Sequence, residues 1–219
     1  MRNIINTVYY AVALLVALDL HEYAHAFVAV RLGDQTPRAM GRLTLNPRPL
    51  VDPFGTLVLP GILLLPVLLA GRFAGSLLFP IFAYAKPMPL NPWNLRRKGA
   101  DAIWVALAGI LANVALAFVF GALLRVSHSL ELARFLIACL QVNVLMAAIQ
   151  IVPIPGLDGG RFVARFLPPR PQEVFVGLEQ YLPLFILAAF FLLGGPILSF
   201  VSAIGNGICQ VAAGGSCLP

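Results

Sequence analysis

The sequence predicts an all-α polytopic membrane protein with about five to six transmembrane segments. Of its 219 residues 60% are hydrophobic and only 11% are charged, and the mean hydropathy is +0.89. Soluble domains carry about 25% charged residues. Several apolar runs approach or exceed the roughly 20 residues that a helix needs to cross a bilayer. Because only helices and closed barrels satisfy their backbone in lipid, runs of this length favour a helical protein.

The polar residues fall into short loops, and no polar block is long enough to fold as a soluble domain. We therefore expect one integral-membrane domain over residues 1–219, with a core at 4–167. The net charge of +6 is interpreted as basic loops at the surface of a lipid bilayer, not as a site for nucleic acid.

The first apolar run, at 4–30, contains the pattern H-E-x-x-H at 21–25. Two histidines four residues apart lie on one face of a helix, because 3.6 residues make a turn. Such a pair can bind one metal ion, and the glutamate between them can reach a metal-bound water. Ionisable groups inside a membrane span are costly, so they indicate function.

The next elements are less regular. The first helix is expected to end near Gly33, a plausible cap. The alternating segment 41–47 predicts a short strand. The apolar segment 56–85 is broken by Gly and Pro, and predicts either two short membrane segments or one helix followed by a re-entrant piece. Its neighbour 86–92 must be extended, because prolines restrict themselves and the residues before them.

The second half is expected to contain helices at 102–124 and 132–152 and a short amphipathic helix at 161–167. A final span follows at 181–204. The last segment, 205–219, is a Gly-rich tail in which Cys209 and Cys217 either pair or stay free.

Basic residues predict the orientation. The loops 31–52, 86–98 and 161–170 are rich in Lys and Arg, which favours the cytosolic side. Segment 56–85 must then enter the membrane and return. The sequence thus predicts a multi-pass protein of the cell membrane, with both termini outward and the motif in the cytosolic half of its helix.

The metal expected is Zn²⁺. Zinc in hydrolases usually takes three protein ligands and leaves a fourth place for water. His21 and His25 supply two, and Asp158, on a Pro- and Gly-rich turn after an apolar helix, is the best candidate for the third. His128, the remaining histidine, is predicted in the opposite loop. Glu22 is then the base that takes a proton from the water.

Three amides lie within the apolar helices, and each could donate a hydrogen bond to the backbone of a substrate. Taken singly, buried amides are more typical of hydrogen bonds between helices. The candidates for binding substrate are Asn113, Asn143 and Gln150.

The motif at 21–25, followed by Pro-Ile-Pro-Gly-Leu-Asp-Gly-Gly-Arg at 153–161, resembles the site-2 protease family of intramembrane zinc metalloproteases. In that family the two histidines and the aspartate bind zinc and the glutamate is the base, which implies these roles for His21, His25, Asp158 and Glu22. Further matches follow in order at 32–34, 41–47, 52–56, 85–92 and 107–109, so the resemblance covers about residues 10–167. It is greatest to compact prokaryotic members without a PDZ domain. Gln150 stands where the family usually has Asn.

The predicted function is that of an intramembrane zinc endopeptidase that cleaves a transmembrane segment of a membrane protein. The edge of the strand at 41–47 could pair with an unwound substrate. One alternative is a metal transporter or sensor with the same His/Asp cluster, although the sequence shows no second polar site along a path to the far side. Another is an inactive relative that binds helices, against which the intact Glu22 argues.

Overall fold

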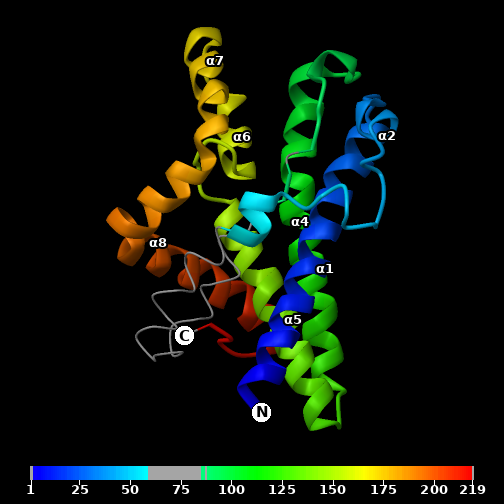
Figure 1. Cartoon of the computed structure of the whole chain (residues 1–219), viewed down its shortest axis with the longest axis vertical. Coiled ribbons are helices and arrows are strands. Elements are labelled where there is room, and N and C mark those ends of the chain that lie inside the picture. The colour runs from blue at the N-terminus through cyan, green and yellow to red at the C-terminus, as the bar shows by residue number, and fades with distance from the viewer. Residues whose placement is uncertain (1, 59–84, 87, 219) are drawn as a thin grey trace.

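Three long helices form a bundle in the computed structural model, which describes residues 2–58, 85–86 and 88–218. They are α1 (Arg2–Arg31), α4 (Lys98–Arg125) and α5 (Leu130–Gln150), and α4 runs opposite to the other two (Figure 1). Each is long and apolar enough to cross a membrane. The predicted all-α membrane class is therefore confirmed.

Local chemistry fixes the ends of these helices. After α1, Gly33 adopts a φ of +116°, which favours glycine, as the sequence predicts. Near the start of α4 the Asp101 carboxylate accepts the backbone N–H of Arg97 at 2.8 Å, and an acid suits the positive end of a helix. At the start of α5 the hydroxyl of Ser129 accepts the N–H of Leu132.

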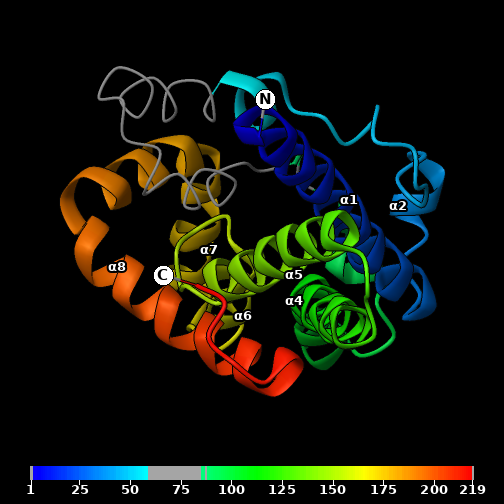
Figure 2. The same ribbon diagram turned by 90° about the horizontal axis from the view of Figure 1, so that it is seen from below.

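The bundle is built around α5, whose residues from Ala138 to Ile149 are all buried. Seen from below, α5 lies between α1, α4 and α8 (Figure 2). On α1 the buried apolar positions are mostly alanines, which let helix backbones approach closely. These alanines are Ala13, Ala17, Ala26 and Ala29.

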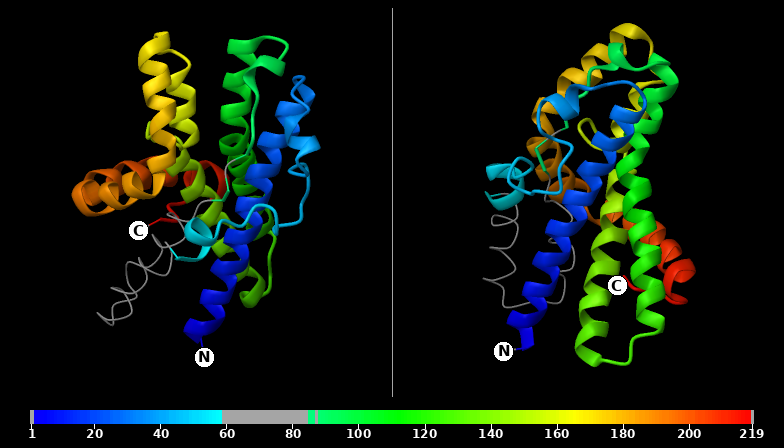
Figure 3. Two further views of the ribbon diagram at one scale, coloured as in Figure 1. Left: turned by 45° about the horizontal axis from the view of Figure 1, so that its top comes forward. Right: turned by 90° about the vertical axis from the view of Figure 1, so that its right-hand side faces the viewer.

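The last helix, α8 (Leu182–Ala213), runs obliquely across the bundle rather than along it (Figures 1 and 3). It is longer than the predicted span 181–204 and takes in much of the expected tail. It contains Pro196, which removes a backbone hydrogen bond and bends helices. It ends at Gly214, whose φ of +85° makes a left-handed cap.

The tail after α8 folds back onto the bundle. Cys209 and Cys217 form a disulfide, which settles the alternative that the sequence leaves open. The side chain of Gln141 on α5 donates to the carbonyl of Cys217, and Asn206 accepts the N–H of Leu218 at 2.9 Å. The tail is thus held against the middle of α5.

Short elements connect the long helices, and of these α2 (Thr36–Ala39) lies beside the end of α1 (Figure 1). Asp34, fully buried just after α1, accepts hydrogen bonds from the backbone of Asn91 at 2.8 Å and the side chain of Asn94 at 3.0 Å. These bonds join the segment after α1 to the one before α4. The short elements are α2 (Thr36–Ala39), η1 (Pro53–Val58), η4 (Pro92–Asn94), α6 (Asp158–Ala164), α7 (Pro169–Gly177) and η5 (Leu178–Tyr181).

The strand predicted at 41–47 is wrong. That segment contains bends and turns, and no described residue is in a strand. A strand needs a partner, whereas here the backbone N–H groups of Asn46 and Arg48 bond to the side chains of Thr44 and Asn46. Such local bonds compete with sheet formation. Most of 56–85, for which two membrane segments or a re-entrant piece were expected, lies outside the described residues.

Candidate metal centre

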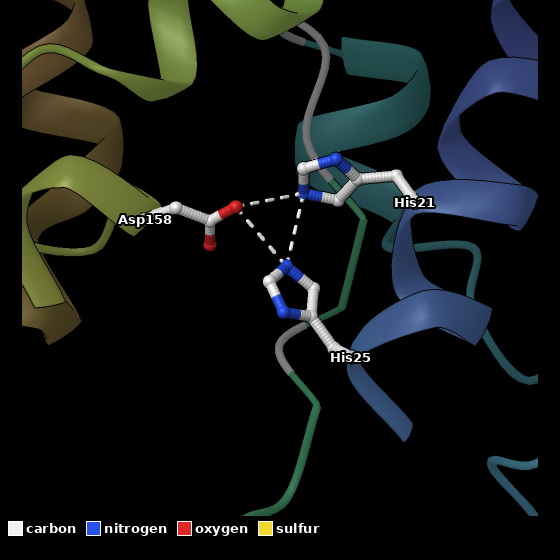
Figure 4. A group of neighbouring side chains, drawn as sticks. All are labelled: His21, His25 and Asp158. Atoms are coloured by element: carbon white, nitrogen blue, oxygen red, sulfur yellow. Dashed lines mark hydrogen bonds and ion pairs between the residues drawn. The ribbon is translucent and has the colours of Figure 1, made fainter. Parts of the chain in front are cut away.

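Three side chains meet at one point inside the bundle. The Nε2 atoms of His21 and His25 lie 3.2 Å apart, and the Oδ2 atom of Asp158 lies 3.2 Å from the first and 3.1 Å from the second (Figure 4). All three residues are at most 3% exposed. The structure thus brings together two residues of α1 with one that lies more than a hundred positions later in the chain.

The spacing within α1 makes the two imidazoles converge, and α4 orients one of them. The Nδ1 atom of His25 lies 2.7 Å from the carbonyl oxygen of Val105. Because a carbonyl can only accept, Nδ1 carries the proton and Nε2 presents its lone pair to the centre. A hydrogen bond of this kind is typical of histidines that bind metals.

Asp158 is placed by the turn that joins α5 to α6. Gly156 in this turn has a φ of +92°, which favours glycine. At the end of α5, the side-chain oxygen of Gln150 accepts the backbone N–H of Asp158 at 3.2 Å. The last turn of α5 therefore holds the first residue of α6 against the histidine pair.

Gly109 on α4 forms the wall behind the imidazoles. A Cβ atom added there would lie 2.4 Å from Cε1 of His21 and 2.4 Å from Nε2 of His25. Real contacts of this kind are never so short, so only glycine lets α4 pass this close. The site thus needs a third helix that contributes no ligand.

The donor set fits zinc. Ligand atoms bound to tetrahedral zinc at about 2.0–2.1 Å lie about 3.3 Å from one another, and the three observed separations are 3.1–3.2 Å. Two imidazole nitrogens and one carboxylate oxygen are ordinary zinc ligands. A buried cluster of three such groups is costly unless a cation joins them. These residues form the one such cluster of His, Cys, Asp and Glu in the part of the chain that the structure describes.

Glu22 lies beside this cluster on α1 without belonging to it. Its Oε2 atom is buried and has no hydrogen-bond partner among the described residues. A carboxylate oxygen without a described partner, beside two candidate metal ligands, is available to accept a proton.

The three predicted amides have different surroundings. Gln150 contacts Asp158, as described above. Asn143 donates to the carbonyl of Cys139, one turn earlier in its own helix, at 2.8 Å. Asn113 is fully buried, one turn from Gly109 on α4, and neither atom of its amide has a described partner. Their role in binding substrate stays a prediction.

A cavity of about 290 Å³ adjoins the metal centre. His25 lines it, and α4, α6, η5 and the segment before η4 form its other walls. Most of the lining is apolar, but three charged side chains also face it: Arg161, Arg165 and Glu179. Of the two histidines, only His25 borders this cavity.

Sequence reasoning missed the contacts of Gly109, Val105 and Glu179. Gly109 falls within a motif that the family resemblance includes, but its role depends on where two helices cross. Val105 acts through its backbone, so its side chain carries no signal. Glu179 pairs with Arg161 across 18 positions, at 3.1 Å between Nη2 and Oε2.

Known proteins with similar sequences are named as zinc metalloproteases. The chain is 32% identical over 183 residues to a Bacillus subtilis protein named "Putative zinc metalloprotease YwhC". The matched region covers 79% of this chain and 75% of the Bacillus subtilis protein. This chain belongs to the site-2 protease family. It is equally similar to "Putative zinc metalloprotease Rip2" of Mycobacterium tuberculosis, at 32% over 182 residues and 80% of this chain.

The chain spans slightly less than two thirds of the mycobacterial relatives. The match covers 64% of the Mycobacterium tuberculosis protein and 60% of the Rip2 protein of Mycolicibacterium smegmatis. No protein-family model matches the chain, and no solved structure matches it significantly. Each of these relatives is named a putative zinc metalloprotease.

Proposed function

We propose that this protein is an intramembrane endopeptidase that cleaves a transmembrane segment of another membrane protein. The observation that carries the proposal is the position of the His21, His25 and Asp158 cluster. His21 and His25 lie on α1, which is long and apolar enough to cross a bilayer, and Asp158 follows the end of α5, a second such helix. All three residues are buried. Ionisable groups at such a depth are costly and mark functional sites.

Zinc, when bound by these residues, would polarise the scissile carbonyl and activate a water molecule. The residues of the chain supply the rest. Val105 fixes the tautomer of His25, and Gln150 fixes the backbone of Asp158. Glu22 takes a proton from the attacking water and delivers it to the leaving amine, since its buried oxygen is free to do both.

The substrate is a membrane helix that unwinds locally. A peptide bond inside a regular helix is shielded by side chains and neighbouring turns, whereas the cavity beside His25 is small and suits a few extended residues. Unwound backbone in a membrane needs hydrogen-bond partners. The unpartnered amide of Asn113 supports such a contact.

The metal centre is proposed to face the cytosol. Most basic residues outside the spans lie near one end of the bundle, the end at which α1 stops and α4 starts (Figure 1). Lys and Arg are enriched in cytosolic loops. The residues concerned are Arg31, Arg38, Arg96, Arg97, Lys98, Arg161, Arg165 and Arg170.

The alternatives have less support. A transporter needs further polar sites along its path, and the described residues contain one cluster able to hold a metal. An inactive helix-binding relative has no use for the unpartnered Glu22. Both alternatives predict that the protein leaves membrane peptides intact.

The test is cleavage of a single-span model peptide by the purified protein in liposomes, with the products identified by mass spectrometry. We expect a cut within the apolar segment. Glu22→Gln should keep its zinc and its melting temperature but lose activity by about 10²–10⁴-fold, as expected for loss of a general base. Equal rates for the two proteins, or a cut outside the membrane segment, would contradict the proposal.

A further inference from the structure

The cavity beside His25 carries an unbalanced positive charge. Two arginines and one glutamate line it, and Arg161 is paired with Glu179 at 3.1 Å. Arg165 is half-buried and makes no ion pair and no side-chain hydrogen bond with any described residue. Arg165 therefore shares the negative charge of Glu179 with Arg161 and has, among the described residues, no carboxylate in direct contact with its own guanidinium.

Apart from His25 and the three charged side chains, the walls of this cavity are apolar. Met88, Leu90, Val105 and Val176 contribute to them, and the same cavity reaches His25. A charge in such surroundings is costly unless a partner of opposite sign arrives. Because a guanidinium binds carboxylates with two parallel hydrogen bonds, a carboxylate is its natural partner.

From these contacts we propose that Arg165 is a specificity-determining residue, which binds an acidic side chain of the substrate on the cytosolic side of the scissile bond. The proposal rests on the proposed function, because it assumes a peptide substrate that enters through this cavity. Arg165 follows Asp158 by seven residues, hence by about 10 Å along a helix. An extended chain covers about 10 Å in three residues, so the acid should lie about three residues from the cut.

This arrangement would also exclude most membrane proteins. The cytosolic flanks of transmembrane helices are usually rich in Lys and Arg. Such a flank would bring a second positive charge next to Arg165 and Arg161. Specificity often comes from repulsion of the wrong partner as much as from attraction of the right one, and here a common basic flank would be rejected while a rare acidic one is accepted.

The test measures binding rather than cleavage. The protein is the full chain with Glu22→Gln, so no peptide is consumed. The probes are three fluorescent single-span peptides that are identical except for the residues flanking the cytosolic end of the apolar segment, which are Asp, Asn or Lys. We expect binding to be tightest for Asp and weakest for Lys, with about fivefold between Asp and Asn, as for a half-exposed ion pair.

Variants of Arg165 give the decisive comparison. Arg165→Gln should abolish the preference for Asp, Arg165→Lys should keep part of it, and Arg165→Glu should reverse it in favour of Lys. Arg170→Gln is the matched control, since Arg170 is exposed and does not line the cavity. Zinc content and melting temperature, measured for every variant, show that the fold is kept.

Two outcomes would overturn the proposal. One is equal binding of the three peptides to the protein with an intact Arg165, or no binding of any of them. The other is a preference for Asp that survives Arg165→Glu. Failure of the proposed function is recognised separately, because the protein with Glu22 intact would then cleave none of the peptides even if the Asp peptide binds best.

Discussion

Single residues decide whether the three ligands can converge. Gly109 is the clearest case, since a Cβ there would lie 2.4 Å from both imidazoles. We expect Gly109→Ala to lower zinc affinity by about tenfold or more, a loss typical when the support of a ligand is disturbed. Gly99→Ala on the same helix is the control, because nothing lies within 4 Å of its added methyl group. Equal zinc titrations for the two variants would show that α4 does not confine the histidines.

Gln150 is the second such residue. Its oxygen accepts the N–H of Asp158, so Gln150→Ala should weaken zinc binding by about 10–100-fold. If Gln150 only bound substrate, Gln150→Ala would leave zinc binding unchanged. Gln141→Ala is a matched control on α5, because Gln141 lies nine residues earlier and contacts Tyr10 and the tail rather than Asp158. If Gln150→Ala binds zinc as tightly as the unmodified chain, Gln150 does not support Asp158, and binding of substrate is its remaining proposed role.

At this scale the sequence suffices to predict which three side chains come together, but not the residues that support them. The spacing of His21 and His25 fixes their common face through helix geometry alone, and Asp158 follows from its motif. The roles of Gly109 and Val105 depend on where α4 crosses α1. No local pattern encodes that crossing, because it results from the packing of the whole bundle.

At the scale of elements, Asp34 joins the end of α1 to the start of α4. Burial raises the pKa of its carboxyl, but hydrogen bonds from Thr36, Asn91 and Asn94 outweigh this, and the net pKa is lowered. A lowered pKa means that the charged form stabilises the fold above the pKa of the unfolded chain, about 3.9. This stabilisation is lost as the pH falls through the lower pKa of the folded state.

We therefore expect the melting temperature in detergent to fall below about pH 4 and Asp34→Asn to flatten that fall. The variant should also lose about 2–3 kcal/mol at neutral pH, because hydrogen bonds to a charged acceptor become weaker. Glu173→Gln, on an exposed position of α7, is the control. If the melting temperature of Asp34→Asn falls at low pH as steeply as that of the unmodified chain, other carboxylates cause the loss of stability in acid.

The sequence predicts the long apolar helices well. It predicts poorly the segments whose structure depends on contacts with other parts of the chain. The helices at 102–124 and 132–152 agree with α4 and α5 within a few residues. The strand at 41–47 failed because alternation alone supplies no neighbouring strand. The sequence predicts an end of the last span at 204, because Gly205 breaks the apolar pattern, but α8 continues to Ala213. Gly205 lies inside this helix at a place where a larger side chain would collide with Leu218.

At the scale of the whole molecule, we expect the end of the bundle that holds the metal centre to face the cytosol. Cysteines introduced at the exposed positions Arg96 and Arg170 should react with an impermeant thiol reagent only after cells are opened, and one at His128 should react in intact cells. The native thiols should not interfere, because Cys139 is buried and the other two are bonded. Labelling of Arg96→Cys from outside would reverse the orientation.

The most direct test of the account is the zinc content of the purified protein. Because His21, His25 and Asp158 make a complete set of three ligands, the unmodified chain should hold about one zinc ion and Asp158→Ala should lose most of it. Glu173→Ala should bind zinc as the unmodified chain does. Stoichiometric zinc in Asp158→Ala, or none in the unmodified chain after zinc is supplied, would contradict the metal centre on which the proposed function depends.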